Sequence, residues 1–349
     1  MTAIIAAACT YPSGPELALA DIAHRLRFAL IRKHPIWTDR CRIPVKACYF
    51  PEVTSAPLVE RFQQLIRQIL TELTNNLPEL KYTPPGLVSL LLPPLNRPGI
   101  TSALTAAANE TVLEMTAWHN TPLHVLHGGR AETVALMNSL VTQTLPQGEI
   151  RVLLAVDSWL SPLSLRWLDD ENLLHGAHRL FRRDVRVNPY GRVPSEGAAA
   201  LVLASTTPGQ RPWCHIRGAG QAAEDVLYSD SGVCLGKGLR QAALQALELA
   251  NITAVRHIVS DFNGEPYRAD ELGFTLSALS HYTDDKLIRE TPALASGDLG
   301  CASLLAHMAL TAWRMNTSAQ SGDTLLLSSS DDCQRGAIVM SKQEGTQPC

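Results

Sequence analysis

The chain has 349 residues, of which 46% are hydrophobic, so it is long enough to bury a large core. The formal net charge is −3 and the Lys and Arg residues are scattered, which argues against a nucleic-acid-binding surface. No apolar segment approaches the roughly 18 residues that a membrane span needs, and the apolar N-terminus lacks the basic region of a signal peptide. We therefore expect a cytoplasmic protein that does not bind membranes.

The eight cysteines indicate reduced thiols rather than a disulfide framework. They contain no CxxC pair and show no metal-ligand spacing to histidine. His119, His124 and His127 are close in sequence, but their spacing fits neither a helical metal pair nor a zinc finger. We expect no metal and no cofactor.

The first part of the chain alternates apolar strands with amphipathic helices, which is typical of an α/β protein with right-handed parallel crossovers. Strands are predicted over residues 3–9, 87–92 and 152–156, from residue 123 to a glycine turn, and within residues 192–204 after a turn, and helices over 16–33, 58–77, 101–118, 131–145 and 163–180. The spacing of Leu19, Ile22, Leu26 and Leu30 predicts that they face the core. Residues 44–57 are expected to be irregular.

A second series of elements in similar order follows a Thr-Thr-Pro-Gly hinge at residues 206–209. Strands are predicted over residues 213–218, 257–261, 324–328 and 336–341, and helices over 235–250 and 269–280, while a strand and glycine turn from 292 lead into a helix ending near 314. We therefore divide the chain into halves at 1–207 and 208–349. If each half adds one helix of small residues to a shared middle layer, the result is a pseudo-twofold α-β-α-β-α sandwich.

The predicted helix at residues 131–145 lies between two strands and begins at Ala131. At the N-terminus of such a buried helix, the free amides and the helix dipole would lower the pKa of a cysteine thiol and stabilise an oxyanion. This chain has only a methyl group at that point.

Four segments, taken in order, resemble the thiolase-fold β-ketoacyl synthases. They are LLAVDSWLSP at residues 153–162, SEGAAALVL at 195–203, DFNGEPYRADE at 261–271 and SGDLGCA at 296–302. The resemblance extends over about residues 100–341 and implies the thiolase fold. It also implies that Glu196 braces neighbouring loops.

The same resemblance implies where the catalytic groups of a condensing enzyme would stand. Such an enzyme needs a thiolate to accept the acyl group and two imidazoles to polarise the thioester and assist decarboxylation. The cysteine position falls at Ala131, the two histidine positions fall at Asn263 and Asp298, and an upstream lysine falls near Ala293. The closing loop, here residues 328–335, lacks the Phe-Gly-Gly pattern of the family. Because these groups act as one unit, we predict a pseudoenzyme that does not condense.

Other residues near these positions allow two interpretations. Cys301 could be a relocated nucleophile with His127 as its base, although a small buried thiol is the commoner role of such a cysteine. Asp298 could share a cleft with Glu132, or it could cap the helix that follows. Asn263 precedes a glycine, a pair that is typical of a turn.

Three functions remain open at this stage. The first is a protein-binding scaffold or accessory factor, since the chain resembles degenerate ketosynthase-like proteins associated with type VI secretion, which implies effector loading. The second is a chain-length-factor-like subunit of a type II ketosynthase heterodimer, with an apolar acyl tunnel and an acyl-carrier protein as partner. The third is an acyltransferase or hydrolase that uses Cys301.

The resemblance also implies that the chain forms a dimer. Thiolase folds pair through a central edge strand, so we expect a homodimer or a heterodimer with a related chain. An unpaired edge would otherwise expose a strand to aggregation. The predicted protein partners are thus a related thiolase-fold chain, a carrier protein, or a secretion component or effector.

Overall fold

The backbone is built around one large mixed sheet, and the computed structural model describes residues 2–53, 55–114, 118–142, 145–181, 184–205 and 211–342. The strands of the sheet are β1 (Thr2–Thr10), β4 (Leu87–Leu92), β5 (Leu123–His127), β6 (Ile150–Ser158), β9 (Glu196–Ser205), β10 (Cys214–Ala223), β11 (Val255–Ser260), β12 (Thr283–Glu290), β13 (Thr324–Ser329) and β14 (Gln334–Ser341). They hydrogen-bond in the order β12-β11-β13-β14-β10-β1-β9-β6-β4-β5.

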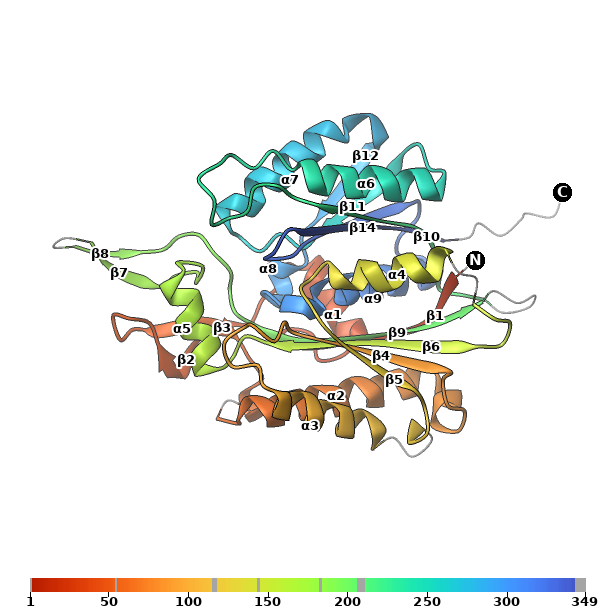
Figure 1. Ribbon diagram of the computed structural model, residues 1–349, viewed down its shortest axis with the longest axis horizontal. Helices are drawn as coiled ribbons and strands as arrows, with labels where there is room; N and C mark the ends of the chain where they lie inside the picture. Colours follow the sequence, from red (N-terminus) through yellow and green to blue (C-terminus); the bar gives the residue numbers. More distant parts are fainter. Residues whose placement is uncertain are drawn as a thin grey trace.

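Helices cover both outer faces of the sheet and fill the space between its two ends. They are α1 (Leu17–Arg25), α2 (Leu58–Asn76), α3 (Ser102–Leu113), α4 (Glu132–Thr142), α5 (Pro162–Asp170), α6 (Lys237–Ala250), α7 (Pro266–Ala278), α8 (Ala293–Ser296) and α9 (Ser303–Asn316). Figure 1 shows α6 and α7 on one outer face, α2 and α3 on the other, and α4 and α9 between the sheet layers. The predicted α-β-α-β-α sandwich is confirmed. None of the described helices combines the length and hydrophobicity needed to cross a bilayer.

The strand that precedes the candidate site is covered on both faces, as its continuous apolar run predicts. On β6, Val152 and Leu154 pack in the core beneath α2 and α3, whereas Leu153 and Ala155 pack in the core around α4 and α9. Successive side chains of a strand point to opposite faces, so a strand between two helical layers needs apolar residues at every position. This arrangement fixes the middle helices above the ends of β6 and β9.

In the middle of the sheet, β1 and β10 are antiparallel neighbours. Their pairing includes Ala3 opposite His215 and Ile4 opposite Cys214, while β1 also pairs along most of its length with β9. The strands of the ten-stranded sheet that come from residues 2–205 run from β1 to β5 in the strand order, and those from residues 211–342 run from β10 to β12. The hinge and the boundary at 207 fall within residues 206–210, outside the described residues, so the division into two halves stays a prediction.

The first helix is shorter than predicted, because the chain turns sharply after Arg25. Arg27 has a φ angle of 50°, its N–H donates to the carbonyl of His24, and the Phe28 N–H donates to the carbonyl of Ala23. This pair of bonds is a Schellman motif, which ends the helix although the left-handed residue is arginine and not the usual glycine. The helix predicted over residues 16–33 is therefore wrong beyond residue 25.

The prediction that the apolar stripe of this helix faces the core is also wrong. The three stripe residues within and next to α1 are exposed: Leu19 (46%), Ile22 (44%) and Leu26 (72%). The side of α1 that packs inward carries Leu17, Ala20 and Ala23 instead. The helix thus has apolar residues on two faces, and spacing alone does not tell which one is buried.

Two antiparallel hairpins form where the sequence predicts irregular or helical structure. β2 (Ile31–Thr38) pairs with β3 (Pro44–Cys48), and β7 (His178–Phe181) pairs with β8 (Asp184–Val187). Figure 1 shows both hairpins at the same end of the molecule as α5, and the Asp39 carboxylate joins them by accepting the backbone N–H of His178 at 2.8 Å. Residues 44–48 are therefore a strand, and the helix predicted over 163–180 ends at residue 170.

A further correction concerns the edge of the sheet in the second half. The chain forms β12 over residues 283–290, where the sequence predicts no element, and the strand expected at residue 292 is the short helix α8. β12 lies at the end of the strand order and is parallel to β11. Its sequence TDDKLIRE is mostly charged or polar because an edge strand has an open side, so it lacks the apolar run of a buried parallel strand.

Candidate functional site

The candidate site lies where α4 and α9 begin, in the middle layer of the fold. Ala131, immediately before α4, is buried, and its backbone N–H donates to the Ser330 hydroxyl at 2.9 Å. A free amide at this place could stabilise an oxyanion, but here it already has an acceptor. A Cβ atom added to Gly129 would lie 2.5 Å from the Ser330 oxygen, so the closing loop packs directly against the turn before α4.

The structure brings Asn263 and Asp298 into direct contact beside this turn. The Asn263 side-chain amide donates to Asp298 Oδ2 at 2.9 Å, and Arg130 Nη2 donates to the same oxygen at 2.5 Å. The Gly300 N–H donates to Asp298 Oδ1 at 2.8 Å. The positions inferred for the two histidines and the residue next to Ala131 therefore meet at one buried carboxylate.

Asp298 and Asn263 also hold local turns. The sequence predicts a turn at Asn263 and a capping role for Asp298. The Asp298 contact to Gly300 fixes the start of a 3-10 helix, Gly300–Ala302, rather than capping α9 itself. The Glu265 N–H donates to Asn263 Oδ1 at 3.3 Å, and Gly264 has a φ angle of 98°. The turn and the long-range contact use different atoms of each side chain.

Asp298 belongs to a larger set of buried charges, which we call the central ion network. Its members are Arg130, Arg192, Arg268, Glu265, Asp298 and Asp331. Asp331 lies within 3.0 Å of Arg130, 3.1 Å of Arg192 and 2.8 Å of Arg268. The three guanidinium side chains are at most 4% exposed, whereas Asp331 is 32% exposed. Three positive and three negative groups balance, which is what allows this much charge to be buried.

The network keeps the carboxylates of Asp298 and Asp331 ionised. Burial alone would raise the pKa of Asp298, but the guanidinium groups of Arg130 and Arg192 hold that pKa well below its ordinary value. Burial would also raise the pKa of Asp331. The charges of Arg192, Arg130 and Arg268 outweigh burial and lower that pKa. A carboxylate that stays ionised cannot donate a proton near neutral pH, so Asp298 does not replace the acid function of a histidine.

A cleft of about 450 Å³ lies in front of the network, and charged groups line much of it. They are Arg97, Arg130, Glu132, Asp157, Asp331 and Asp332. Burial and then the charge of Asp332 raise the pKa of Glu132. Asp298 lines a different hollow, of about 260 Å³, so the alternative in which Glu132 and Asp298 share one cleft does not hold.

Cys301 is at the edge of the same cleft, but its thiol is poorly placed to react. Its N–H donates to the Asp157 carboxylate at 2.8 Å, and its Sγ lies 3.5 Å from the Val156 carbonyl oxygen. Burial, followed by the negative charge of Asp157, raises the pKa of Cys301 well above the usual value. His127 uses both ring nitrogens elsewhere, on the Pro93 carbonyl at 2.8 Å and the Thr105 hydroxyl at 3.1 Å. A thiol that is neutral and buried is inert.

Two further buried ion pairs hold the walls of the site. Glu196 lies 2.7 Å from Arg61, both side chains being fully buried, and accepts the Phe50 N–H at 3.0 Å. The role of Glu196 as a brace between loops is thus confirmed. Arg97 binds Asp157 through two nitrogens at 2.9 and 2.5 Å.

Sequence reasoning singled out Ala131, Asn263 and Asp298, which lie close together in the structure, but it missed the arginines around them. A signal was present, because each segment that departs from the ketosynthase pattern also carries a charged residue that the core then buries. Arg130 precedes Ala131, Arg268 follows Asn263 in the same segment, and Asp331 lies in the altered closing loop. Ala293, at the inferred lysine position, begins α8.

Comparisons with known proteins place this fold. No protein-family model matches the chain, and no curated protein sequence matches it. Among solved structures, it is similar to the ishigamide ketosynthase/chain length factor, with 13% identity, coverage of 98% of this chain and 99% of that one, and a TM-score of 0.69.

Two further structures agree with that result. The AntDE:AntF complex, a type II PKS acyl-carrier protein with its ketosynthase, matches over 97% of this chain and 98% of that one, at 13% identity and a TM-score of 0.75. The ketosynthase from module 6 of the bacillaene synthase from Bacillus subtilis 168 matches over 98% and 72%, at 13% identity and a TM-score of 0.71. The chain therefore has the thiolase fold of ketosynthases and chain length factors.

Proposed function

We propose that this chain is a non-condensing thiolase-fold subunit that works by pairing with a related chain, in the manner of a chain length factor. The observation that carries the proposal is the state of the site before α4. A methyl group stands at Ala131 where a condensing enzyme needs a thiolate, and the Asp298 carboxylate stands at an imidazole position. Condensation requires all of these groups together, so their joint replacement argues for a supporting role.

The central ion network supports a structural role for the former reaction centre. Removing one partner of a buried ion pair costs about 3–5 kcal/mol of stability, because the other charge is left buried without a partner. Each of the six charges therefore depends on the others. Arg192 connects three of its carboxylates, from Glu265 to Asp331 and Asp298. We infer that these contacts hold α4, the closing loop and the turn before α9 in a fixed geometry, without turnover.

β5 provides an edge through which a second chain could pair. It stands at one end of the ten-stranded order and hydrogen-bonds to β4 on one side. An open strand edge presents N–H and C=O groups that another strand can satisfy. A related chain added there would continue the sheet, which is the pairing expected of this fold.

The neighbours favour a chain-length-factor-like subunit over a secretion factor. One is described as a ketosynthase/chain length factor and another as a ketosynthase with its acyl-carrier protein. Effector loading in type VI secretion has no comparable support here and stays a prediction. Because charged side chains line the cleft beside Ala131, we propose that this subunit pairs with the related chain and does not itself bind the acyl chain.

Affinity purification of the full chain from the organism that encodes it, followed by mass spectrometry, tests the proposal. We expect an equimolar thiolase-fold chain that carries the missing cysteine and histidines. Secretion components in its place, or a monomer with no thiolase-fold partner, would contradict the assignment.

A pair of variants locates the interface. Val125→Pro on β5 should release the related chain, whereas Ile288→Pro on β12, the strand at the opposite end of the sheet, should not. Both variants are first compared with the parent by circular dichroism. Carrier-protein substrates added to the purified chain alone should give neither decarboxylation nor condensation, and turnover by that chain would identify an enzyme instead.

A further inference from the structure

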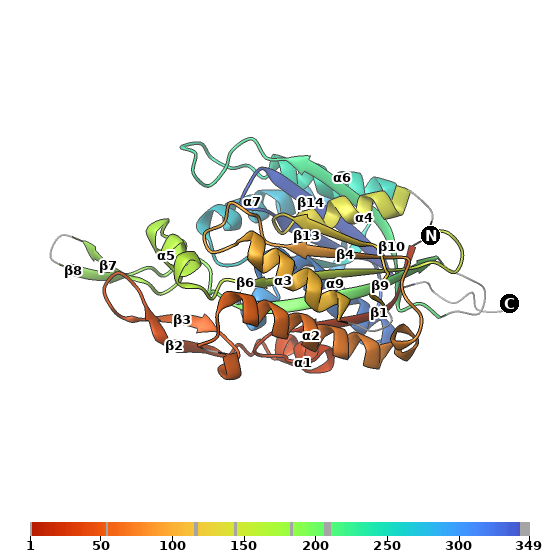
Figure 2. The same cartoon turned by 60° about the horizontal axis from the view of Figure 1, so that its bottom comes forward.

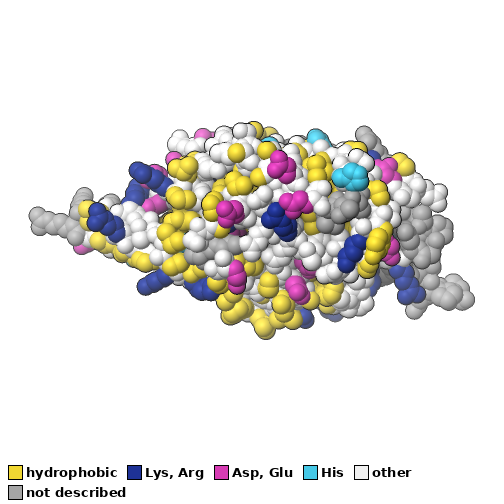
Figure 3. Space-filling model, turned by 90° about the horizontal axis from the view of Figure 1, so that it is seen from below, with side chains coloured by type: hydrophobic (Ala, Val, Ile, Leu, Met, Phe, Trp, Pro, Cys, Tyr) yellow, Lys and Arg dark blue, Asp and Glu magenta, His cyan; other side chains and the backbone are white. Residues whose placement is uncertain are grey.

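The exposed side of α1 carries a row of large apolar residues. Leu19, Ile22 and Leu26 are three and four residues apart, so they share one face of the helix, and Phe28, which is 52% exposed, follows them. Figure 2 places α1 at the lower edge of the molecule, and Figure 3 shows hydrophobic side chains gathered along that edge. A surface helix normally presents polar residues outward. The outward face of α1 thus resembles a contact face.

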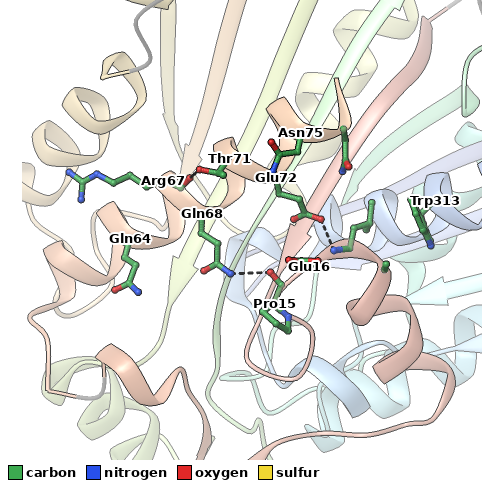
Figure 4. Close-up of a pocket in the computed structure, with 12 residues that line it drawn as sticks. Pro15, Glu16, Gln64, Arg67, Gln68, Thr71, Glu72, Asn75 and Trp313 are labelled. Atoms are coloured by element: carbon green, nitrogen blue, oxygen red, sulfur yellow. Dashed lines mark hydrogen bonds between the residues drawn. The ribbon is translucent and has the colours of Figure 1, made fainter. Parts of the chain in front are cut away.

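Two hollows in the surface lie near this row. A groove of about 600 Å³ runs between the first turn of α1 and α2, and Ala18, one turn before Ile22, lines it. Figure 4 shows Gln64, Gln68 and Asn75 from α2 along the groove, with Trp313 at one end. A second hollow, of about 260 Å³, is lined by Ile31 and Leu294.

These residues form one track, which we call the α1 surface. It comprises Ala18, Leu19, Ile22, Leu26, Phe28, Ile31 and Leu294. Leu294 belongs to α8, which packs against α1, and its side chain is 55% exposed. Recognition of a helix needs an apolar strip with recesses for side chains spaced three, four and seven residues apart. The α1 surface supplies the apolar strip, with a groove at the first turn of α1.

The exposed charges that follow α1 in the chain are positive. Arg27 and Lys33 are exposed, while Arg25 pairs with Asp21 at 3.1 Å and Glu16, exposed before α1, lines the groove at the first turn. A partner without acidic residues would leave Arg27 and Lys33 uncompensated. Acidic residues on the occupant would instead complement them.

We propose that the α1 surface is the docking site for an amphipathic helix of a partner protein, whose apolar face is flanked by Glu or Asp residues. Apolar side chains of that helix pack on Leu19, Ile22 and Leu26, while its carboxylates face Arg27 and Lys33. This docking does not use the edge of β5, so it goes beyond the proposed function and does not depend on it.

Site-specific photo-crosslinking tests the proposal. The photoreactive amino acid p-benzoylphenylalanine replaces Leu26 in the full chain, in the organism that encodes it, and mass spectrometry maps the crosslinked segment. The matched control replaces Leu249, which is 48% exposed on α6. We expect the Leu26 position to capture one segment with apolar residues at helical spacing and carboxylates beside them, and the Leu249 position not to capture it.

Charge reversal makes the test specific. The pair Arg27→Glu and Lys33→Glu should lower the crosslinking yield about tenfold or more, and added salt should lower it in the parent chain. Ile22→Ser, a neutral change at an exposed site, should lower it as well. Both variants should melt at the parent temperature and retain the related chain at β5, so this proposal and the preceding one can fail separately.

Several outcomes would overturn the inference. They are no crosslink from Leu26, the same segment captured from Leu249, a crosslink to a second copy of this chain, and a captured segment without acidic residues or insensitive to charge reversal.

Discussion

The centre of this molecule and the outer face of α1 reverse the usual distribution of residues. Soluble proteins bury apolar side chains and expose charges, and they bury charges only in pairs. Here the site at the tip of α4 buries three arginines with Glu265 and Asp298 and pairs them with the partly exposed Asp331, whereas α1 leaves Leu19, Ile22 and Leu26 in solvent. The charges of the first region have partners within the chain, and the apolar row of the second has none that the described residues provide. The comparison supports a stabilising role for the interior and the proposed docking role for the surface.

The largest expected effect follows from breaking the central ion network. Arg192→Ala leaves the carboxylates of Glu265, Asp298 and Asp331 with fewer counter-charges in a buried place, and should lower the free energy of unfolding by about 3–5 kcal/mol. Urea denaturation monitored by circular dichroism measures this change.

The matched control for that measurement is Arg67→Ala, which breaks an ion pair with Glu114 in which both side chains are about half exposed. It should have little effect, because solvent screens such a pair. Equal losses from the two variants would mean that the network contributes no more than surface pairs do.

The next largest loss of stability is expected at Leu17, on the side of α1 that packs inward. Leu17 is 1% exposed, and Leu17→Ala should cost about 2–5 kcal/mol through lost burial and a cavity. Denaturant titration of this variant sets the scale for the exposed side of the same helix. A loss below that range would show that α1 contributes little to the core.

The pH dependence of stability should report the lowered pKa of Asp298. Its carboxyl has a lower pKa in the folded chain than in the unfolded chain, where about 3.9 is normal, so its stabilising contribution is complete above about pH 4 and is lost as the pH falls further. The stability difference between the parent and Asp298→Asn should therefore shrink below about pH 4.

Urea midpoints at successive pH values from neutrality downward measure that difference. Asp184→Asn, on the exposed strand β8, is the control and should follow the parent at every pH. A gap between parent and Asp298→Asn that stays constant into strong acid would contradict the role assigned to the arginines.

The regular, buried elements could be predicted from the sequence, because their periodicity reflects burial. The helix predicted over residues 58–77 is α2 (Leu58–Asn76), and the strand predicted over 87–92 is β4 (Leu87–Leu92). The ends and edges could not be predicted in the same way. A Schellman turn with arginine at its left-handed position ends α1, and the charged sequence of β12 follows from its open edge.

The candidate site was predictable only in what it lacks. The absence of the thiol and imidazoles can be predicted from the short segments that resemble ketosynthases, because each of these positions belongs to a single segment. The contacts that replace them join distant residues: Arg130 and Asp298 are 168 positions apart, and Arg130 and Asp331 are 201 apart. No periodic pattern encodes such a pairing, so only the folded chain reveals that an ion network surrounds Asn263 and Asp298.

The reactivity of the cysteines distinguishes an inert core thiol from a relocated nucleophile. Cys333 is exposed and should react first with a thiol-directed alkylating reagent, whereas Cys301 should react only when the chain unfolds, because burial raises its pKa and shields it. Pulsed alkylation with peptide mapping, with and without denaturant, gives both rates. Rapid labelling of Cys301 in the native chain would revive the hydrolase or acyltransferase hypothesis.

The smallest expected effect completes the comparison with which we began. Leu26→Ser, at a side chain that is 72% exposed, should change the free energy of unfolding by no more than about 0.5 kcal/mol, because it removes little buried area. Against the loss expected for Leu17→Ala, nine positions earlier, this near-zero value would show that the outer apolar face of α1 does not stabilise the isolated chain. If Leu26→Ser destabilised the purified chain as strongly as Leu17→Ala, the residue would belong to the core, and the argument for an unoccupied docking face would fail. Unchanged stability combined with loss of the docked partner in affinity purification of Leu26→Ser would mean that binding, and not folding, requires leucine at this position.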